Sequence, residues 1–138
     1  MQRSSLILVV VAVFALIVMG LFAMPFVFMG TPSPLFSLEN KDINAHDVTI
    51  EIMDFNNNSI FINTYALEPD TRISQVKSNE LIRQLSIPPG NSKETIVKVT
   101  LGNNITESRS FNLQFGTTVE IRLFENYDSP ISIEVSSA

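Results

Sequence analysis

An uncharged apolar run near the N-terminus constrains this chain more than any other feature. Residues Leu6–Met29 read LILVVVAVFALIVMGLFAMPFVFM and contain no charged side chain. At ~1.5 Å per residue in a helix, such a run exceeds the ~30 Å hydrocarbon core of a bilayer. The sequence therefore predicts a transmembrane helix within residues 1–29, in contact with membrane lipid through residues 6–29.

A cleaved signal peptide is the alternative interpretation of this segment, because Arg3 precedes the apolar run. The apolar part of a signal peptide is usually only ~7–15 residues long and is followed by small residues at the cleavage site. Here Phe22–Met24 and Val27–Met29 place bulky side chains at the corresponding positions. We therefore expect an uncleaved signal-anchor. Because Arg3 precedes the helix, we expect a cytoplasmic N-terminus and an extracytoplasmic C-terminal domain at the cell membrane.

The charge of the remaining chain excludes one large class of partners. Residues 31–138 hold all 14 acidic residues and 8 of the 9 basic residues, which gives a formal charge of −6. An acidic surface repels the phosphates of DNA and RNA. We therefore expect no nucleic-acid partner for this protein.

A short linker separates the apolar run from a region in which apolar and polar residues mostly alternate. Residues 30–34, GTPSP, contain two prolines that favour extended backbone, and residues 35–138 are long enough for one extracytoplasmic domain. Apolar residues alternate with polar ones in most of this region, and Asn-, Gly- and Pro-containing turns separate the alternating segments. The predicted strands are Leu35–Asn40, His46–Phe55, Ser59–Leu67, Leu81–Ile87, Glu94–Leu101, Arg109–Phe115, Thr118–Phe124 and Ile131–Val135.

The predicted fold is all-β, an immunoglobulin-like antiparallel β-sandwich of about 7–8 strands preceded by one transmembrane helix. Short connections favour antiparallel hairpins, and strands with one apolar face must bury that face against a second sheet. The weakest strand in this prediction is Leu81–Ile87. Ser78–Leu85 also has the pattern of a short helix, with a polar cap at its start and Pro88 just beyond its end.

The turn sequences carry a resemblance to a known group of proteins. The segments ENKDINAHDVTIEIMDFNNNSIFINTYALEPD and IPPGNSKETIVKVTLGNNITESRSFNLQFGTTVEIRLFE resemble small archaeal, methanogen-type proteins that carry a membrane-anchored Ig-like β-sandwich. Within Leu67–Asp70, Asp70 stands where that group usually has Gly. The resemblance implies a fold and a place in the cell envelope, and it implies no chemistry.

The residues that commonly carry catalysis or bind metals are scarce in this sequence. The chain contains one histidine, His46, and no cysteine, which disfavours nucleophilic catalysis and zinc binding. Oxygen-bearing side chains around Asp42–Asp47 could bind calcium weakly, although their spacing differs from that of an EF-hand loop. We predict that the protein is not an enzyme and that it has no catalytic residue, no cofactor and no resident metal.

Two N-glycosylation signals are the most specific motifs in the chain. Asn57-Asn58-Ser59 and Asn104-Ile105-Thr106 match N-x-[ST], and each falls on the tip of a predicted hairpin. Asn is also a residue that tight turns prefer, so the turns alone can explain its presence. Asn57 and Asn104 are therefore candidate glycosylation sites. Counting chain reversals, we expect these two tips at opposite ends of the sandwich.

These features predict a non-enzymatic, membrane-anchored module that docks to a protein of the envelope or of a membrane assembly. Edge strands are the natural docking sites of such a sandwich. One alternative is a pilin-like filament subunit, although Ser4 follows Arg3 where archaeal pilin precursors have Gly or Ala. Another alternative is an extracellular ligand-binding or sensory module. The partner and the oligomeric state do not follow from the sequence.

The signal-anchor interpretation has a direct test in the mature protein. Because the apolar run is long and lacks a cleavage motif, we expect the membrane-bound protein to retain its N-terminus at or near Met1 and to resist extraction by carbonate. Terminal sequencing by mass spectrometry measures the first property. An N-terminus close to Gly30 would identify the run as a cleaved signal peptide.

Overall fold

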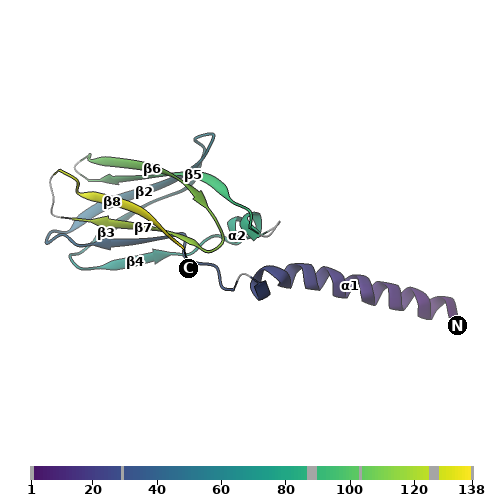
Figure 1. The fold of residues 1–138 in the computed structure, drawn as a ribbon. Coiled ribbons are helices and arrows are strands. Elements are labelled where there is room, and N and C mark those ends of the chain that lie inside the picture. Colours follow the sequence, from purple (N-terminus) through teal and green to yellow (C-terminus); the bar gives the residue numbers. More distant parts are fainter. Residues whose placement is uncertain (1, 29, 87–89, 103, 125–127, 138) are drawn as a thin grey trace. The chain divides into compact units, whose positions relative to one another are not determined.

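The computed structural model describes residues 2–28, 30–86, 90–102, 104–124 and 128–137. The chain divides into two compact units, Met1–Thr31 and Pro32–Ala138. Helix α1 (Gln2–Phe28) belongs to the first unit, and the remaining elements form the second (Figure 1). These are β1 (Phe36–Asn40), β2 (His46–Asp54), β3 (Ser59–Leu67), β4 (Arg72–Gln75), α2 (Asn79–Ser86), β5 (Lys93–Leu101), β6 (Thr106–Leu113), β7 (Thr117–Leu123) and β8 (Ile131–Ser137).

Helix α1 has no polar face over its central part. Its most apolar stretch, Ser5–Ala23, has a mean hydropathy of 3.2 and is long enough to cross a membrane. Large apolar side chains such as Leu6, Phe14 and Leu16 are exposed around the helix. A helix that is apolar on all sides is stable only in an apolar environment. The sequence prediction of one long apolar helix is therefore confirmed, although Met29 lies outside the described residues.

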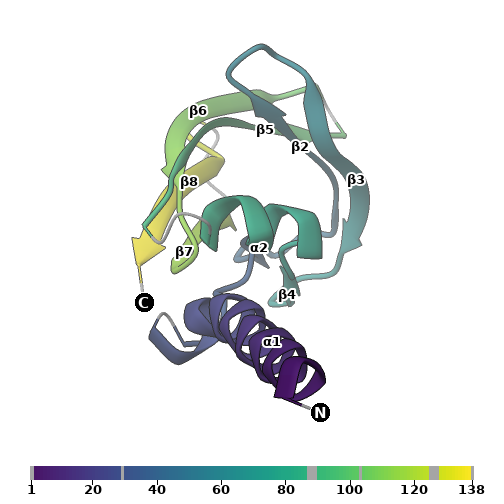
Figure 2. The ribbon, with the colours of Figure 1, turned by 90° about the vertical axis from the view of Figure 1, so that its right-hand side faces the viewer.

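The second unit consists of two four-stranded sheets that face each other (Figure 2). One sheet has the order β4-β1-β7-β8, and the other has the order β3-β2-β5-β6. Apolar residues alternate along the strands and meet between the sheets, as the period of two predicted. Phe36 of β1 also contacts the rings of Phe61 and Tyr65 on β3, at centroid distances of 5.6 and 6.0 Å. The largest fully buried side chains are Phe36, Leu38, Val48, Ile50, Ile52, Leu85, Val97, Val99, Phe115, Val119, Ile121 and Leu123.

One strand pair departs from the expected antiparallel arrangement. Strand β1 pairs with β7 in parallel, with Phe36 opposite Val119 and Asn40 opposite Leu123. The other strand pairs found among the described residues are antiparallel. No hairpin joins β1 to β7, so local chain reversal does not set their relative direction. The prediction of a purely antiparallel sandwich was therefore wrong at this pair.

The predicted strand Leu81–Ile87 was also wrong, because this segment forms helix α2 as far as Ser86. The Ser78 hydroxyl caps the helix by accepting a hydrogen bond from the Leu81 amide at 3.2 Å. Leu81 and Leu85 lie on the side of α2 that faces the sheets, and Leu85 is fully buried. The polar cap and the spacing of the two leucines favour a helix over a strand. Figure 2 shows α2 between the two sheets at one end of the sandwich.

Strand β4 was missed by the sequence analysis. It spans only four residues, Arg72–Gln75, and pairs with β1 from Phe36 to Glu39. Four residues are too few for a clear alternating pattern. The other seven predicted strands are confirmed, with bounds that differ by no more than three residues.

The two turns that carry the glycosylation signals lie at opposite ends of the sandwich. We call the end where the chain enters at Ser33 the linker end. The β2–β3 turn with Asn57 lies at the linker end, because β3 begins beside Phe36, the first residue of β1. The β5–β6 turn with Asn104 follows Leu101, which pairs with Val48 near the start of β2 at the opposite end. The expected arrangement holds because two errors of the prediction offset each other. The missed strand β4 adds one reversal of chain direction between β3 and β5, and the strand predicted at Leu81–Ile87 is removed from the count because that segment forms α2.

The burial of Val97 gives a test of the strand register. Val97 on β5 is fully buried between the sheets, whereas Ser110 on β6 is exposed. Replacing Val97 with Asp places a charge in the apolar core at a cost on the order of several kcal/mol, so we expect loss of cooperative unfolding. Ser110→Asp is the matched control and should leave the denaturation midpoint nearly unchanged. Circular dichroism during urea titration measures both; a silent V97D change would contradict the register of β5.

Candidate functional site

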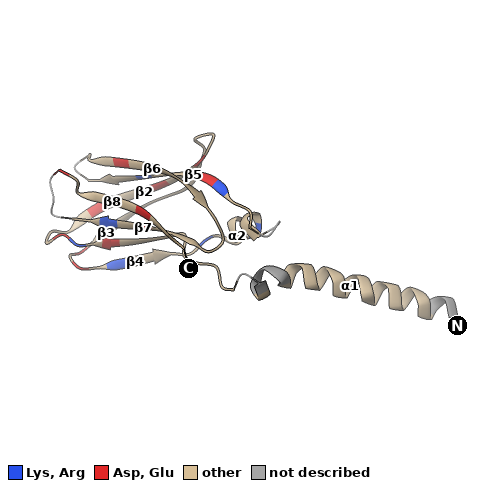
Figure 3. Ribbon diagram, viewed as in Figure 1, with Lys and Arg blue, Asp and Glu red and all other residues tan. Residues whose placement is uncertain are grey.

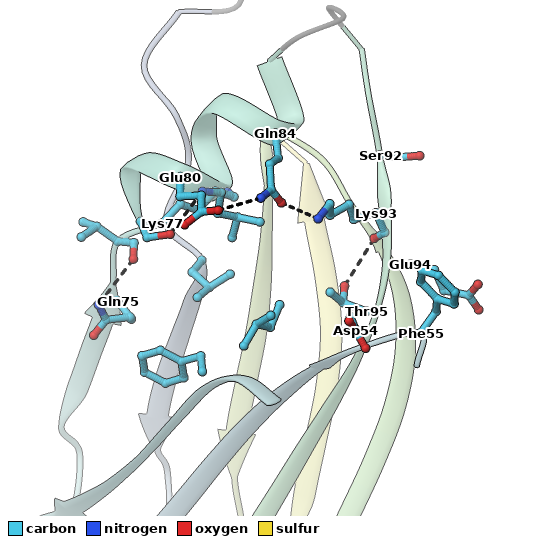
Figure 4. Close-up of a pocket in the computed structure, with 16 residues that line it drawn as sticks. Asp54, Phe55, Gln75, Lys77, Glu80, Gln84, Ser92, Lys93, Glu94 and Thr95 are labelled. Atoms are coloured by element: carbon cyan, nitrogen blue, oxygen red, sulfur yellow. Dashed lines mark hydrogen bonds between the residues drawn. The ribbon is translucent and has the colours of Figure 1, made fainter. Parts of the chain in front are cut away.

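A cavity lies between the two sheets beneath helix α2 at the linker end (Figure 4). Its volume is about 580 Å³, which is within the ~300–1,000 Å³ range of ligand pockets. Leu35 beside the first sheet, Phe61 on β3 and Leu81 on α2 contribute apolar walls. Phe55 and Val76, also part of the lining, are 69% and 72% exposed. This end of the sandwich therefore combines a cavity with exposed apolar side chains.

A chain of polar side chains runs along one wall of this cavity. The Gln84 amide nitrogen donates to Glu80 Oε1 at 3.2 Å, and the Lys93 ammonium donates to Gln84 Oε1 (Figure 4). Asn91 donates from its side chain to the Gln84 carbonyl at 2.7 Å. These bonds join α2 to the start of β5 and hold the helix over the cavity.

Lys77 occupies a cage of main-chain carbonyl oxygens next to the cavity. It follows β4, and only 3% of its surface is exposed. The ammonium lies 2.6 Å from Ser33 O, 3.1 Å from Pro34 O, 3.3 Å from Phe115 O and 2.6 Å from Thr117 O. Through these bonds Lys77 ties the segment where the chain enters the sandwich to the turn between β6 and β7.

Burial governs the acid–base behaviour of Lys77. Desolvation disfavours the charged ammonium and lowers the pKa of Lys77 to about 8. Among the described residues, no carboxylate forms an ion pair with it. The carbonyl oxygens supply the hydrogen bonds that keep the buried ammonium satisfied.

The segment that Lys77 holds is bonded to the sandwich by further contacts. The Ser33 hydroxyl donates to the Gly116 carbonyl at 3.1 Å, and the Thr118 hydroxyl donates to Pro34 O at 3.0 Å. The Leu35 amide donates to Gln75 O at 2.7 Å. Ser33 and Pro34, which the sequence analysis assigned to the linker, are thus fixed to the body of the sandwich.

Strand β3 is an edge strand that differs from the other three edges. It pairs only with β2, and none of its nine residues, SIFINTYAL, is charged. Ile60 and Ile62 on this strand are 49% and 63% exposed. Edge strands usually carry charges or prolines, or are very short, because their unpaired backbone groups can bind another strand. Strand β3 has none of these protections, although its pairing with β2 contains a bulge at Ile52/Met53.

Each of the other three edge strands carries a charged residue, and β4 is also very short. Strand β4 is four residues long and begins with Arg72, which donates to both carboxylate oxygens of Glu120. Strand β6 carries Arg109, whose guanidinium donates across the gap between the sheets to Ile133 O at 2.6 Å. Strand β8 carries Glu134, which pairs with Arg122 at 3.6 Å. Figure 3 shows these charges on β4, β7 and β8.

Asn57 and Asn104, the glycosylation candidates, occupy equivalent positions in two turns of the same kind. In each turn the main-chain N–H of the Asn donates to the main-chain carbonyl three residues earlier. The distance is 3.0 Å from Asn57 N to Asp54 O and 2.9 Å from Asn104 N to Leu101 O. Both have left-handed backbone, with φ of 61° for Asn57 and 67° for Asn104. Asn tolerates this conformation better than most residues, which explains its presence in both turns. Both side chains are exposed, and their glycosylation stays a prediction.

In the loop around Asp42–Asp47, the Asp42 side chain is bonded to partners within the protein. Asp42 accepts from His46 Nε2 at 2.6 Å, and this hydrogen bond lowers the pKa of Asp42. Glu39 instead pairs with Lys41 at 3.0 Å. Within the described ranges, no three acidic, His or Cys side chains gather at a site suitable for a metal. His46 thus serves as a hydrogen-bond partner of a buried carboxylate in this loop.

Asp70 fills the turn position at which the resembling proteins usually have Gly. Its φ is 55°, and the Thr71 amide donates to Glu68 O across the turn at 3.3 Å. Glycine adopts left-handed backbone without steric cost, and Asp is among the other residues that tolerate it. The turn therefore forms with Asp in place of Gly.

Sequence reasoning missed the burial of Lys77, the cavity and the position of β3 at an unprotected sheet edge. Lys77 is a single lysine after a strand that the sequence analysis did not predict, so no motif indicated its burial. The uncharged stretch Ser59–Leu67 was a visible signal, but its place at a sheet edge depends on the topology.

Comparisons with known proteins assign no family to this chain. No family model matches the chain, and no curated protein matches it. An NMR structure of a protein from Eubacterium rectale is 10% identical, with a TM-score of 0.38 over 75% of this chain and 89% of that one.

The lowered pKa of Lys77 predicts how stability depends on pH. The unfolded chain, with an ordinary pKa of 10.5, binds more protons than the folded chain between pH ~8 and ~10.5. The contribution of Lys77 to the free energy of unfolding should therefore rise with pH across this window, by at most about 3 kcal/mol. Urea titrations of the wild type and Lys77→Met at pH 7 and 9.5 measure this difference.

The control for this experiment is Ser110→Met on the exposed side of β6, which removes no titratable group and should leave the pH dependence of the wild type unchanged. If Lys77→Met does not fold, the Lys77 side chain can be titrated directly by NMR in the wild type. A midpoint near 10.5 in that titration would contradict the effect of burial.

Proposed function

We propose that this protein is a non-enzymatic, membrane-anchored interaction module that binds a partner protein by adding a strand to the edge of β3. The observation that carries the proposal is the long, uncharged edge strand with two exposed isoleucines, Ile60 and Ile62. Addition of a strand satisfies unpaired main-chain groups and supplies affinity through hydrogen bonds. The protein would thus act as an accessory subunit that docks to an assembly of the membrane or cell envelope.

The anchor in this proposal is helix α1. Its length and uniformly apolar surface support a membrane-spanning role. Arg3 at its start supports a cytoplasmic N-terminus, with the sandwich on the extracytoplasmic side. We also propose that the two sheets are a variant of the immunoglobulin-like arrangement, modified by the parallel pairing of β1 and β7.

The use of the buried charged groups supports a non-enzymatic role. Lys77 and Asp42 are the buried charged residues among those described, and both are engaged in structural hydrogen bonds. His46 binds Asp42 through Nε2. The groups best suited to acid–base chemistry are thus used to hold loops in place.

A second candidate function is the binding of a small ligand in the cavity beneath α2. The volume of about 580 Å³ and the mixture of apolar walls with a polar chain favour this candidate. Such a module would sense or carry a ligand on the outer side of the membrane.

A charged residue on β3 tests the proposed docking edge. We expect Ile62→Lys to reduce partner binding at least tenfold, because a lysine on an edge strand opposes pairing with a further strand. Ser110→Lys on the opposite edge strand β6 is the matched control and should bind normally. Quantitative crosslinking in native membranes compares the wild type with both variants, and equal adducts from all three would rule out docking at β3.

A further inference from the structure

We propose that the partner segment is an uncharged strand flanked by basic residues, with one bulky apolar side chain that enters the cavity beneath α2. This inference rests on the proposed docking of a strand at β3 and specifies the chemistry of that strand. Three features of the sandwich lead to it: the uncharged edge, the acidic turns at both ends of that edge, and the position of the cavity beside the start of β3.

The uncharged edge selects the central part of the partner strand. Over nine residues β3 offers no charge with which a partner side chain could pair. Its outer face carries Ile62 next to Thr64, and the Thr64 hydroxyl is hydrogen-bonded to that of Thr49 at 2.8 Å. A charge on the added strand would lose water on this surface without gaining an ion pair. Apolar and hydroxyl side chains are therefore the suitable residues opposite β3.

The acidic turns select the flanks of the partner strand. Asp54 precedes β3, and hydrogen bonds from Asn58 lower its pKa, so this carboxylate is ionised at neutral pH. Glu68 and Asp70 follow β3 and are exposed. Within the described part of the chain, neither of these two forms an ion pair. Lysine or arginine at both ends of the partner strand would complement these charges.

The same charges oppose pairing of β3 with a second copy of this protein. In an antiparallel pair of two β3 strands, Asp54 of each copy would approach Glu68 and Asp70 of the other. In a parallel pair, each acidic turn would meet its own equivalent. Like charges brought together cost free energy in either arrangement. The charge pattern therefore favours a different protein as the partner.

The cavity provides a binding site for one bulky side chain of the partner strand. Ile60 and Phe61, at the start of β3, are part of both the docking edge and the cavity lining. The cavity lies between the sheets, so a partner residue on the inward face of an added strand would point toward it. If the added strand runs antiparallel to β3, the more stable arrangement, its C-terminal end reaches the cavity. Aromatic and large aliphatic side chains buried in pockets supply much of the affinity of protein interfaces.

Three synthetic peptides test this inference on the full-length protein in lipid nanodiscs. The first alternates Thr and Val, has two lysines at each end, and carries Phe at the last inward position before the C-terminal lysines. The second replaces Phe with Ala, and the third replaces the lysines with Glu. Fluorescence anisotropy measures the dissociation constants, and amide hydrogen exchange reports protection along Ser59–Leu67.

We expect the Phe peptide to bind at least tenfold more tightly than the Ala peptide and to protect the amides of β3. The Glu peptide should bind at least tenfold more weakly than the Phe peptide at low salt. Gln84→Trp, which fills the cavity from α2, should lower the affinity for the Phe peptide to that for the Ala peptide. Arg83→Trp is the matched control, because Arg83 is exposed on the same helix and does not line the cavity.

The possible results separate this inference from the proposed function. Equal binding of the Phe and Ala peptides with protection of β3 would overturn insertion into the cavity and leave docking at β3 intact. Equal binding of the Phe peptide, which has lysine flanks, and the Glu peptide would overturn the assignment of basic flanks. Self-association of the protein that Ile62→Lys abolishes would identify a second copy as the occupant. If no peptide protects β3, the proposed docking itself fails.

Discussion

The ammonium of Lys77 in its cage of carbonyl oxygens holds together the end of the sandwich on which the candidate site depends. Four main-chain oxygens, from Ser33, Pro34, Phe115 and Thr117, surround it within 3.3 Å. A buried ammonium without a counter-ion is costly, and the hydrogen bonds from this cage offset part of that cost. In return, the cage fixes the segment that leads into β1 and the segment that leads into α2. Lys77 and Leu35, from these segments, line the cavity beneath α2.

The two sheets of the sandwich have different outer surfaces, which makes one edge suited to binding. In the sheet with β1, Arg72 pairs with Glu120, and Arg122 lies within ion-pair distance of both Glu39 and Glu134. This surface is well solvated and its edges carry charge. In the sheet with β3, the outer surface has hydroxyl pairs and isoleucines, and the ion pair found there joins Glu51 to Lys98. A partner strand can therefore approach β3 without displacing strongly hydrated groups.

The errors of the sequence prediction share a physical cause. Strand β4 has four residues and owes its extended conformation to pairing with β1, so local pattern could not reveal it. Helix α2 has the composition of either a helix or a strand, and the Ser78 cap together with burial of Leu85 decides for the helix. The direction of β1 relative to β7 depends on packing between segments far apart in the sequence. Each of these features depends on contacts that the alternating pattern does not encode. For β4 and β7 the contact is pairing with β1, and for α2 it is the local Ser78 cap together with burial of Leu85.

The sequence alone determined the apolar helix and most of the strands, and it determined the inward face of regularly alternating strands such as β5, β7 and β8, because these depend on local periodicity. It also indicated the two Asn-containing turns, since left-handed backbone restricts the choice of residue at one position. Only the tertiary structure decided that Lys77 is buried, that the cavity borders β3 and that β3 lies at an unprotected edge. These properties depend on which strands become neighbours, and that is set by the packing of the whole domain rather than by any local pattern.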